Sequence, residues 1–335
     1  METKFRKSKS SVLFILVLSV LFVWLDSCNL RPGACPEVAE YYFRADATTQ
    51  TMPDGKVVPM WGFAQDSEFG KMDGTVSVPG PQIAIQSCTQ KVIVHLDNNL
   101  PEPTSIVING LTAQMTPVRY PDGRVRSFTH ETPPGNPVSV NYGWQVARPG
   151  TYLYQSGTHP AVQVQMGLYG ALIQEAGQKL AYPGQEYDKE GLLIFSEIDP
   201  VIHDAVAADN FGAGKAVTSA IDYAPQYMLV NGKPFMSTDP VNNAGNVGQH
   251  LLVRFLNAGL LTHAPTLYGA HMTVIAEDAH PYNYPKQLSS ALLPAGKTLD
   301  VLITPAFPGQ YAILDRMLHL YGPGKTVMQR YLVNP

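Results

Sequence analysis

An internal repeat with a constant spacing runs through this chain of 335 residues. Residues 90–98 (QKVIVHLDN) match residues 249–257 (QHLLVRFLN), and both are apolar runs that end at an asparagine. Two further matches are Gly110 with Gly269 and Pro149-Gly150-Thr-Tyr152 with Pro308-Gly309-Gln-Tyr311. The offsets 249 − 90, 269 − 110, 309 − 150 and 311 − 152 are all 159 residues. A spacing this constant predicts a duplicated domain.

The composition and turn pattern predict that each copy is a β-sandwich. Hydrophobic residues make up 45% of the chain and charged residues 15%, and the 28 Gly and 28 Pro are spread along it. Short β-rich runs separated by such turn residues are typical of Greek-key sandwiches. We expect one domain over residues 36–176 and a second over 185–335, with a polar linker between them. Residues 119–137 and 199–224 are predicted loops, the first with a turn at Tyr120-Pro-Asp-Gly123 and the second with one helical turn.

The N-terminal residues 1–28 are typical of an export signal. Four cations (Lys4, Arg6, Lys7 and Lys9) precede an apolar run over residues 12–25, which is short for a bilayer span. Leu25-Asp-Ser-Cys28 resembles a bacterial lipoprotein processing box, although Asp26 departs from it. Cys28 is therefore a candidate for lipidation, with simple cleavage or a retained anchor as the alternatives. The expected location is the periplasm, the cell surface or the medium, with membrane anchoring through the N-terminus if Cys28 is lipidated or the anchor is retained.

The three cysteines agree with export. If Cys28 is lipidated or removed, Cys35 and Cys88 remain as a natural disulfide pair, which an oxidising compartment favours over two free thiols. The net charge is −4 and no block of basic residues is present, so nucleic acid is not an expected partner.

Several motifs together resemble multicopper oxidases. They are residues 59–63 (PMWGF), 78–81 (VPGP), 98–106 (NNLPEPTSI), 150–170, 227–235 (YMLVNGKPF) and 271–278 (HMTVIAED). The likeness covers most of residues 50–335. It implies an all-β fold of two tandem cupredoxin-like Greek-key β-sandwich domains, where larger relatives have a third domain.

The resemblance breaks at the copper ligands. That family carries one His-x-His pair where Gln155, Ser156 and Gly157 stand here, and another in the place of residues 107–109 (VIN). No His-x-His occurs in the sequence, and no Cys follows Cys88. A type 1 copper needs two His and a Cys, and the trinuclear cluster needs paired imidazoles. We therefore predict that both sites are lost and assign no catalytic residue, with copper kept only as a candidate cofactor.

Four histidines remain as candidate metal ligands: His159, His263, His271 and His319. The resemblance places Met166 at an axial copper position and Ser156 near the essential cysteine, but a serine hydroxyl is a poor copper ligand. His159 is more simply a turn or interface residue. Convergence of His263, His271 and His319 could bind Cu(II) or Zn(II). Glu197, Asp199 and His203 could form an acid–base set, with a polar loop as the simpler interpretation.

These observations leave three functional hypotheses. The leading one is an exported protein without its oxidase centre, which acts as a binding or assembly accessory with a protein partner or as a homo-oligomer, a trimer being one arrangement. The competing hypothesis is a laccase-like, copper-dependent oxidoreductase whose site has unusual ligands or is completed by a partner. The third is a metal-handling protein that uses second-domain His and scattered Met residues.

Overall fold

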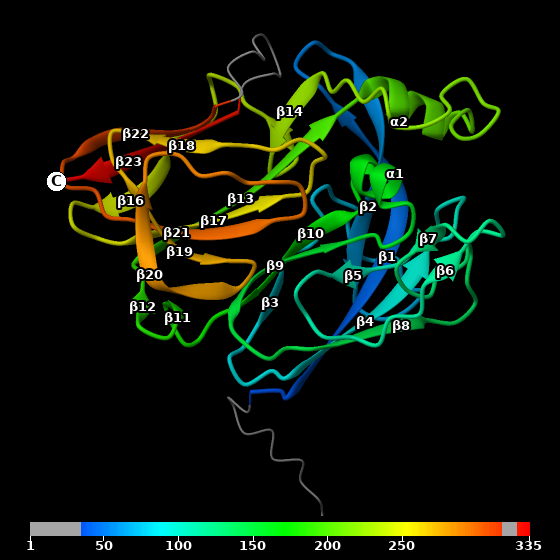
Figure 1. The fold of residues 1–335 in the computed structure, drawn as a ribbon, viewed down its shortest axis with the longest axis horizontal. Helices are drawn as coiled ribbons and strands as arrows, with labels where there is room; N and C mark the ends of the chain where they lie inside the picture. Colours follow the sequence, from blue (N-terminus) through cyan, green and yellow to red (C-terminus); the bar gives the residue numbers. More distant parts are fainter. Residues whose placement is uncertain (1–34, 317–326) are drawn as a thin grey trace, which may run out of the picture. The chain divides into compact units, whose positions relative to one another are not determined.

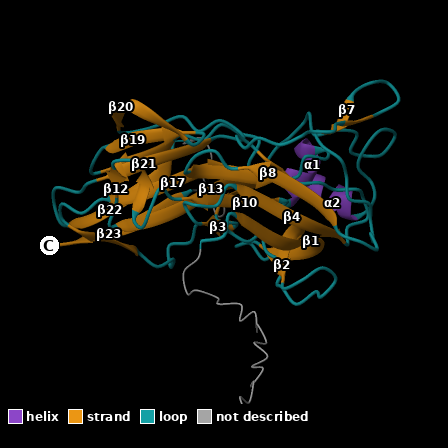
Figure 2. Ribbon diagram, turned by 90° about the horizontal axis from the view of Figure 1, so that it is seen from below, coloured by secondary structure: helices purple, strands orange, loops and turns teal. Residues whose placement is uncertain are grey.

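The computed structural model describes residues 35–316 and 327–335. The predicted signal, Cys28 and His319 lie outside the described residues. Strands dominate, as expected from the sequence (Figures 1 and 2). Within the described residues, neither helix is long and apolar enough to cross a membrane.

The first half forms two four-stranded sheets, in the orders β2-β1-β4-β8 and β3-β10-β9-β5. Its elements are β1 (Val38–Thr51), β2 (Val57–Asp66), β3 (Ile83–Ile85), β4 (Lys91–Asn98), β5 (Val107–Ile108), β6 (Val118–Arg119), β7 (Val125–Ser127), β8 (Val140–Gln145), β9 (Gly150–Gln155), α1 (Pro160–Met166) and β10 (Tyr169–Gln174). A short hairpin of β11 (Leu180–Tyr182) and β12 (Gln185–Glu186) follows.

The second half repeats this topology. Its elements are β13 (Lys189–Ile198), α2 (Pro200–Ala207), β14 (Tyr227–Val230), β15 (Lys233–Pro234), β16 (Asn242–Asn246), β17 (Leu251–Asn257), β18 (Pro265–Tyr268), β19 (Met272–Glu277), β20 (His280–Leu288), β21 (Thr298–Ile303), β22 (Gly309–Asp315) and β23 (Met328–Asn334). The orders β14-β13-β17-β21 and β16-β23-β22-β18 correspond strand for strand to those of the first half. The predicted duplication is confirmed, while β15, β19 and β20 extend the larger sheet.

Similar hydrogen bonds from the two repeat asparagines support the duplication, with an offset of 159 residues for the first acceptor and 161 for the second. Asn98 Nδ2 donates to the carbonyls of Glu102 and Thr132, both at 2.9 Å. Asn257 Nδ2 donates to those of Leu261 at 2.7 Å and Leu293 at 2.8 Å. Each amide satisfies one carbonyl of the turn that follows its strand and one carbonyl 34 or 36 residues further along the chain, which is why an asparagine ends both apolar runs.

A second matched contact explains the paired tyrosines and glycines. The hydroxyl of Tyr152 donates to the Arg148 carbonyl at 2.7 Å, and that of Tyr311 donates to the Phe307 carbonyl at 2.8 Å. Gly110 and Gly269 have φ of 87° and 95°, and a Cβ on either would come within 3.5 Å or 3.1 Å of the corresponding tyrosine ring. The positive φ favours glycine at both positions, and at Gly269 the close ring also leaves little room for a Cβ.

The structure contains two short helices, one of which the sequence analysis missed. α1 begins at Pro160 within the segment that we expected to be strand and turn, because proline fits the first helical turn. α2 is longer than the single predicted turn, and Asp199 caps it by accepting from Val201 N at 2.9 Å. Both helices contact β2 (Figure 1).

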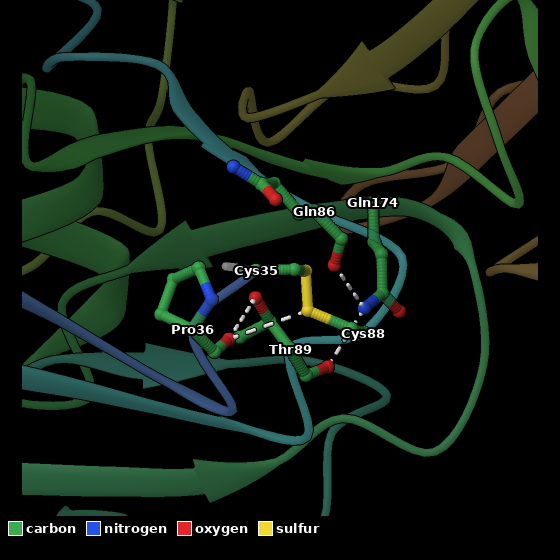
Figure 3. The surroundings of a disulfide bond; sticks show 6 residues. All are labelled: Cys35, Pro36, Gln86, Cys88, Thr89 and Gln174. Carbon is green, nitrogen blue, oxygen red and sulfur yellow. Dashed lines mark hydrogen bonds between the residues drawn. A yellow bond between two sulfur atoms is a disulfide. The ribbon is translucent and has the colours of Figure 1, made fainter. Parts of the chain in front are cut away.

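The predicted disulfide between Cys35 and Cys88 is present (Figure 3). It ties the segment before β1 to the loop before β4. Hydrogen bonds reinforce this attachment: Thr89 Oγ1 donates to the Pro36 carbonyl at 3.0 Å, and Gln174 Nε2 donates to the Thr89 carbonyl at 2.8 Å. Together, the disulfide and these hydrogen bonds connect the N-terminal segment to both sheets of the first half.

β17 is buried along its whole length because it faces two different cores. Val253 and Phe255 point into the second-half core, which also holds Phe195 and Val301. Leu256 packs with Leu153 and other first-half residues on the opposite face. A strand buried on both faces is apolar throughout, as the sequence of this repeat segment indicated.

Arg254 is the exception on that face, and it connects the two halves through polar contacts. Its side chain is 0% exposed. Nε donates to Glu190 at 2.5 Å, Nη1 donates to Thr151 Oγ1 at 3.0 Å, and Asp300 lies 3.7 Å from Nη1. Thr151 Oγ1 also lies 2.7 Å from Asp300 Oδ1. Burial opposes the charge of Arg254, but Asp300 and Glu190 outweigh it and raise its pKa.

We expect Arg254→Met to lower the free energy of unfolding by about 3–5 kcal/mol, since it leaves the buried Asp300 carboxylate without its cation. The matched control is Lys297→Met, which removes a partly exposed cation paired with Glu277 and Asp278 and should cost less than about 1 kcal/mol. Denaturant-induced unfolding measures both. Equal losses in the two variants would contradict the role assigned to Arg254.

Candidate functional site

The two segments that correspond to His-x-His pairs lie side by side in the first half. β5 and β9 pair antiparallel, with Val107 opposite Gln155 and Ile108 opposite Tyr154. Asn109 follows β5, and its amide donates to the Leu153 carbonyl at 3.2 Å. The two strands are therefore placed so that ligands on them could meet, but neither segment contains a histidine.

Behind β9, three polar side chains meet in the interior. Thr104, Ser156 and Gln163 are each 0% exposed. Gln163 Oε1 accepts hydrogen bonds from Thr104 Oγ1 at 2.8 Å and from Ser156 Oγ at 2.7 Å. Gln163 Nε2 donates to the Pro103 carbonyl at 2.9 Å. The three side chains satisfy one another, as buried polar groups must.

These donors do not fit copper. Copper in such folds is held by imidazole, thiolate and thioether groups, whereas this interior offers two hydroxyls and one amide. Met166, the predicted axial position, is the last residue of α1 and is 0% exposed within the first-half core.

His159 lies at the beginning of α1 and contacts a loop. Its φ of 39° and ψ of 55° place it in the left-handed region, and its side chain does not cap the helix. The ring stacks on Tyr120 at 5.7 Å between centroids, and Nε2 is hydrogen-bonded to the Tyr120 hydroxyl. Nδ1 lies 3.8 Å from Glu102 Oε2. Sequence reasoning gave His159 a turn or interface role and did not foresee the tyrosine.

His263 occupies the corresponding interior position of the second half. The 159-residue offset relates it to Thr104 and relates Asp315 to Ser156. Its Nε2 lies 2.5 Å from Glu197 Oε1, and its Nδ1 lies 2.5 Å from Asp315 Oδ2. The ring is 0% exposed. Burial lowers the pKa of His263, but the hydrogen bonds to Asp315 and Glu197 outweigh it and raise the pKa to about 9.

Glu197 is enclosed by further donors. Its Oε2 accepts from Tyr223 Oη at 2.9 Å and from Leu260 N at 3.0 Å. Burial and the nearby Glu197 carboxylate raise the pKa of Tyr223 well above its usual range. An imidazolium whose two ring nitrogens are each hydrogen-bonded to a carboxylate offers no free lone pair to a metal. This cluster is therefore an ion-paired centre.

Of the other candidate histidines, only His159 and His271 lie within the described residues. His271 is exposed at the beginning of β19, and His319 lies outside the described residues. Over residues 35–316 and 327–335, no group of three or more His, Cys, Asp or Glu side chains is arranged to hold a metal ion. A shared site of the three histidines stays a prediction.

The polar-loop interpretation of Glu197 is wrong, because this residue lies within β13 and is 2% exposed. Nor do Asp199 and His203 form a free acid–base set. Asp199 Oδ2 accepts from Ala224 N at 2.9 Å, and His203 Nδ1 lies 2.7 Å from the Pro59 carbonyl. Burial lowers the pKa of His203 despite that carbonyl. These groups hold α2 and the following loop in place.

The raised pKa of His263 makes stability depend on pH. In the folded state this pKa is about 9, against an ordinary value of 6.5. The stabilisation of the fold by protonated His263 is therefore complete below about pH 6.5 and is lost as the pH rises through about 9. The shift corresponds to about 3 kcal/mol. Chemical unfolding between these pH values should show this loss in the native protein, while His263→Gln should be less stable and show a flatter profile.

His203→Gln is the matched control for this prediction. His203 is also buried, but its pKa is lowered. It therefore causes no decrease in the free energy of unfolding between about pH 6.5 and 9. This variant should keep the native slope in that range. A slope that survives His263→Gln would contradict the assignment.

Comparisons with known proteins agree with this geometry of the fold. Two family models, both described as multicopper oxidase, match residues 70–179 and 192–333. The chain is 27% identical over 252 residues to the iron transport multicopper oxidase Fio1 of Schizosaccharomyces pombe, a match over 75% of this chain and 37% of that relative. The chain thus spans little more than a third of the length of this relative.

Among solved structures, the blue copper oxidase of Nitrosomonas europaea matches with a TM-score of 0.68 at 20% identity, over 89% of this chain and 86% of that one. The copper nitrite reductase of the same organism matches with a TM-score of 0.67 at 19% identity, over 89% and 94%. At these identities the likeness shows the fold. With both halves matched by its models, the chain belongs to the multicopper oxidase family and has the tandem cupredoxin-like fold of its members.

Proposed function

We propose that this protein is an exported member of the multicopper oxidase family that lacks the type 1 and trinuclear copper sites. It acts as a non-catalytic binding or assembly accessory in the periplasm or at the cell surface. The observation that carries the proposal is the pairing of β5 with β9, where the residues in place of the two His-x-His pairs contribute no imidazole.

The donor chemistry supports the loss of both centres. The first segment offers Val107, Ile108 and the amide of Asn109, and the second offers the amide of Gln155 and the hydroxyl of Ser156. Neutral amide and hydroxyl groups compete poorly with water for Cu(II), whereas imidazole and thiolate bind it strongly. A metal in the interior would also have to displace the bonds that Gln163 makes to Thr104 and Ser156.

The second half supports the same conclusion. His263 is the buried imidazole at the equivalent position, and both of its nitrogens are bonded to carboxylates. A copper ion would have to displace Glu197 or Asp315 and release a proton from the ring. The resulting buried carboxylate without a partner would be costly.

An exported location is supported by the disulfide between Cys35 and Cys88, since such bonds persist in oxidising compartments. The predicted signal over residues 1–28 and lipidation at Cys28 belong to the same proposal. The partner is a second protein chain, such as a copper-bearing cupredoxin, or further copies of this chain in a trimer.

Copper analysis of the mature protein tests the loss of the metal sites. After loading with Cu(II) and dialysis, inductively coupled plasma mass spectrometry should find copper far below one atom per chain. The double variant Val107→His/Gln155→His is the matched positive control, because directly opposed residues on paired strands bring two imidazoles within chelating distance. Stoichiometric copper in the native chain would contradict the proposal and favour the copper-dependent oxidoreductase.

Light scattering coupled to size-exclusion chromatography tests the oligomeric version of the proposal. A trimer should be observed at high protein concentration and should dissociate on dilution if the contact is weak. A monomer at all concentrations would exclude the trimer and leave a different protein as the partner.

A further inference from the structure

We propose that Tyr120, His159 and Glu102 form a proton-coupled redox site at the surface of the first half. In this site Tyr120 loses an electron to a one-electron outer-sphere oxidant while its hydroxyl proton moves to His159. The inference goes beyond the proposed function and needs no bound metal. It depends on the contact of the Tyr120 hydroxyl with His159 Nε2 and on the groups that surround this pair.

The backbone fixes both rings. Tyr120 begins the turn predicted from the sequence, in which Gly123 N donates to its carbonyl at 2.9 Å and its own amide donates to Arg124 O at 2.8 Å. His159 N donates to the Arg126 carbonyl at 2.9 Å. His159 also adopts a left-handed backbone, with φ of 39°. Such a conformation is costly for a residue other than glycine and is concentrated at functional sites.

The surroundings favour loss of the proton together with the electron. Oxidation of a phenol alone would leave a positive charge on its ring, and the Arg124 guanidinium lies 5.2 Å from the Tyr120 ring centroid. Asp122 pairs with that guanidinium at 2.7 Å and offsets part of its charge. The electron still leaves more easily when the proton leaves as well, because the product is then a neutral radical and no positive charge remains on the ring. His159 Nε2 is the base within reach of that proton.

Glu102 stabilises the product. When His159 accepts the proton, it becomes an imidazolium. Its Nδ1 lies 3.8 Å from Glu102 Oε2. The balanced step breaks the O–H bond of Tyr120 and forms an N–H bond at His159 Nε2. It yields a neutral tyrosyl radical, an imidazolium paired with Glu102, and an oxidant reduced by one electron. Two further cations lie near this turn: Arg126 is paired with Glu131, and Arg119 Nη1 donates to the Gly123 carbonyl at 2.8 Å.

The base distinguishes Tyr120 from other tyrosines. Over residues 35–316 and 327–335, it is the tyrosine whose hydroxyl bonds to an imidazole ring nitrogen; those of Tyr187 and Tyr227 bond to carboxylates. Imidazole is a stronger base than a carboxylate. The side chain of His159 is 33% exposed and that of Glu102 is 47% exposed, so an oxidant can reach the site without entering the protein.

Stopped-flow oxidation of the full chain by hexachloroiridate(IV) tests the proposal. The native protein should show a fast phase, and freeze-quenched samples should show a tyrosyl radical by electron paramagnetic resonance. Tyr120→Phe should lose both signals. His159→Gln should slow the fast phase by about tenfold or more, because the hydroxyl proton loses its acceptor.

Two further variants keep the test decisive. Glu102→Gln, at a position where the side chain is 47% exposed, should also slow the fast phase, because the imidazolium forms without its counter-charge. Tyr268→Phe removes a tyrosine that is 50% exposed and should behave like the native protein. An unchanged fast phase and radical in Tyr120→Phe, or a native rate of the fast phase in both His159→Gln and Glu102→Gln, would overturn the proposal.

Discussion

One buried cation, Arg254, links the two halves through polar contacts in addition to their apolar packing. Arg254 lies on an otherwise apolar face of β17, where its charge would be very costly without partners. Glu190 and Asp300 compensate that charge from the second half, and Thr151 of β9 accepts a hydrogen bond from it. Because β9 begins beside Thr151 and ends at Gln155, the strand that carries the first-half site is held by this same contact.

The duplicated scaffold holds two different polar centres at one equivalent position. In the first half, Thr104 and Ser156 form a neutral centre with Gln163. In the second half, the equivalent residues are His263 and Asp315, and Glu197 completes an ionic centre. The same pair of sheets thus accommodates either hydroxyls or a buried ion pair. Family membership therefore indicates the fold, whereas the side chains at this position decide the chemistry.

The sequence predicted features that depend on local pattern or on the repeat. The constant offset identified the duplicated sandwich, and the cysteine count identified the pair Cys35 and Cys88. The turn at Tyr120-Pro-Asp-Gly123 followed from its turn residues and is present. In each case the deciding signal lies within a short segment, or in the comparison of two such segments.

Features that depend on long-range contacts could not be predicted. Glu197 and His263 are 66 residues apart, and no sequence pattern connects them. Gln163 was overlooked because its partners come from the loop before β5 and from the end of β9, which meet only in the folded chain. The contact between Tyr120 and His159 joins the β6–β7 turn to the beginning of α1, and no signal in the sequence would have shown it.

We propose above that the region around β5 and β9 of the first half holds no copper. Anomalous diffraction at the copper absorption edge, from crystals grown with Cu(II), would test it most directly. If the copper sites are lost, no anomalous peak should lie between β5 and β9 or beside Ser156. A strong peak there, with protein atoms within bonding distance, would contradict it.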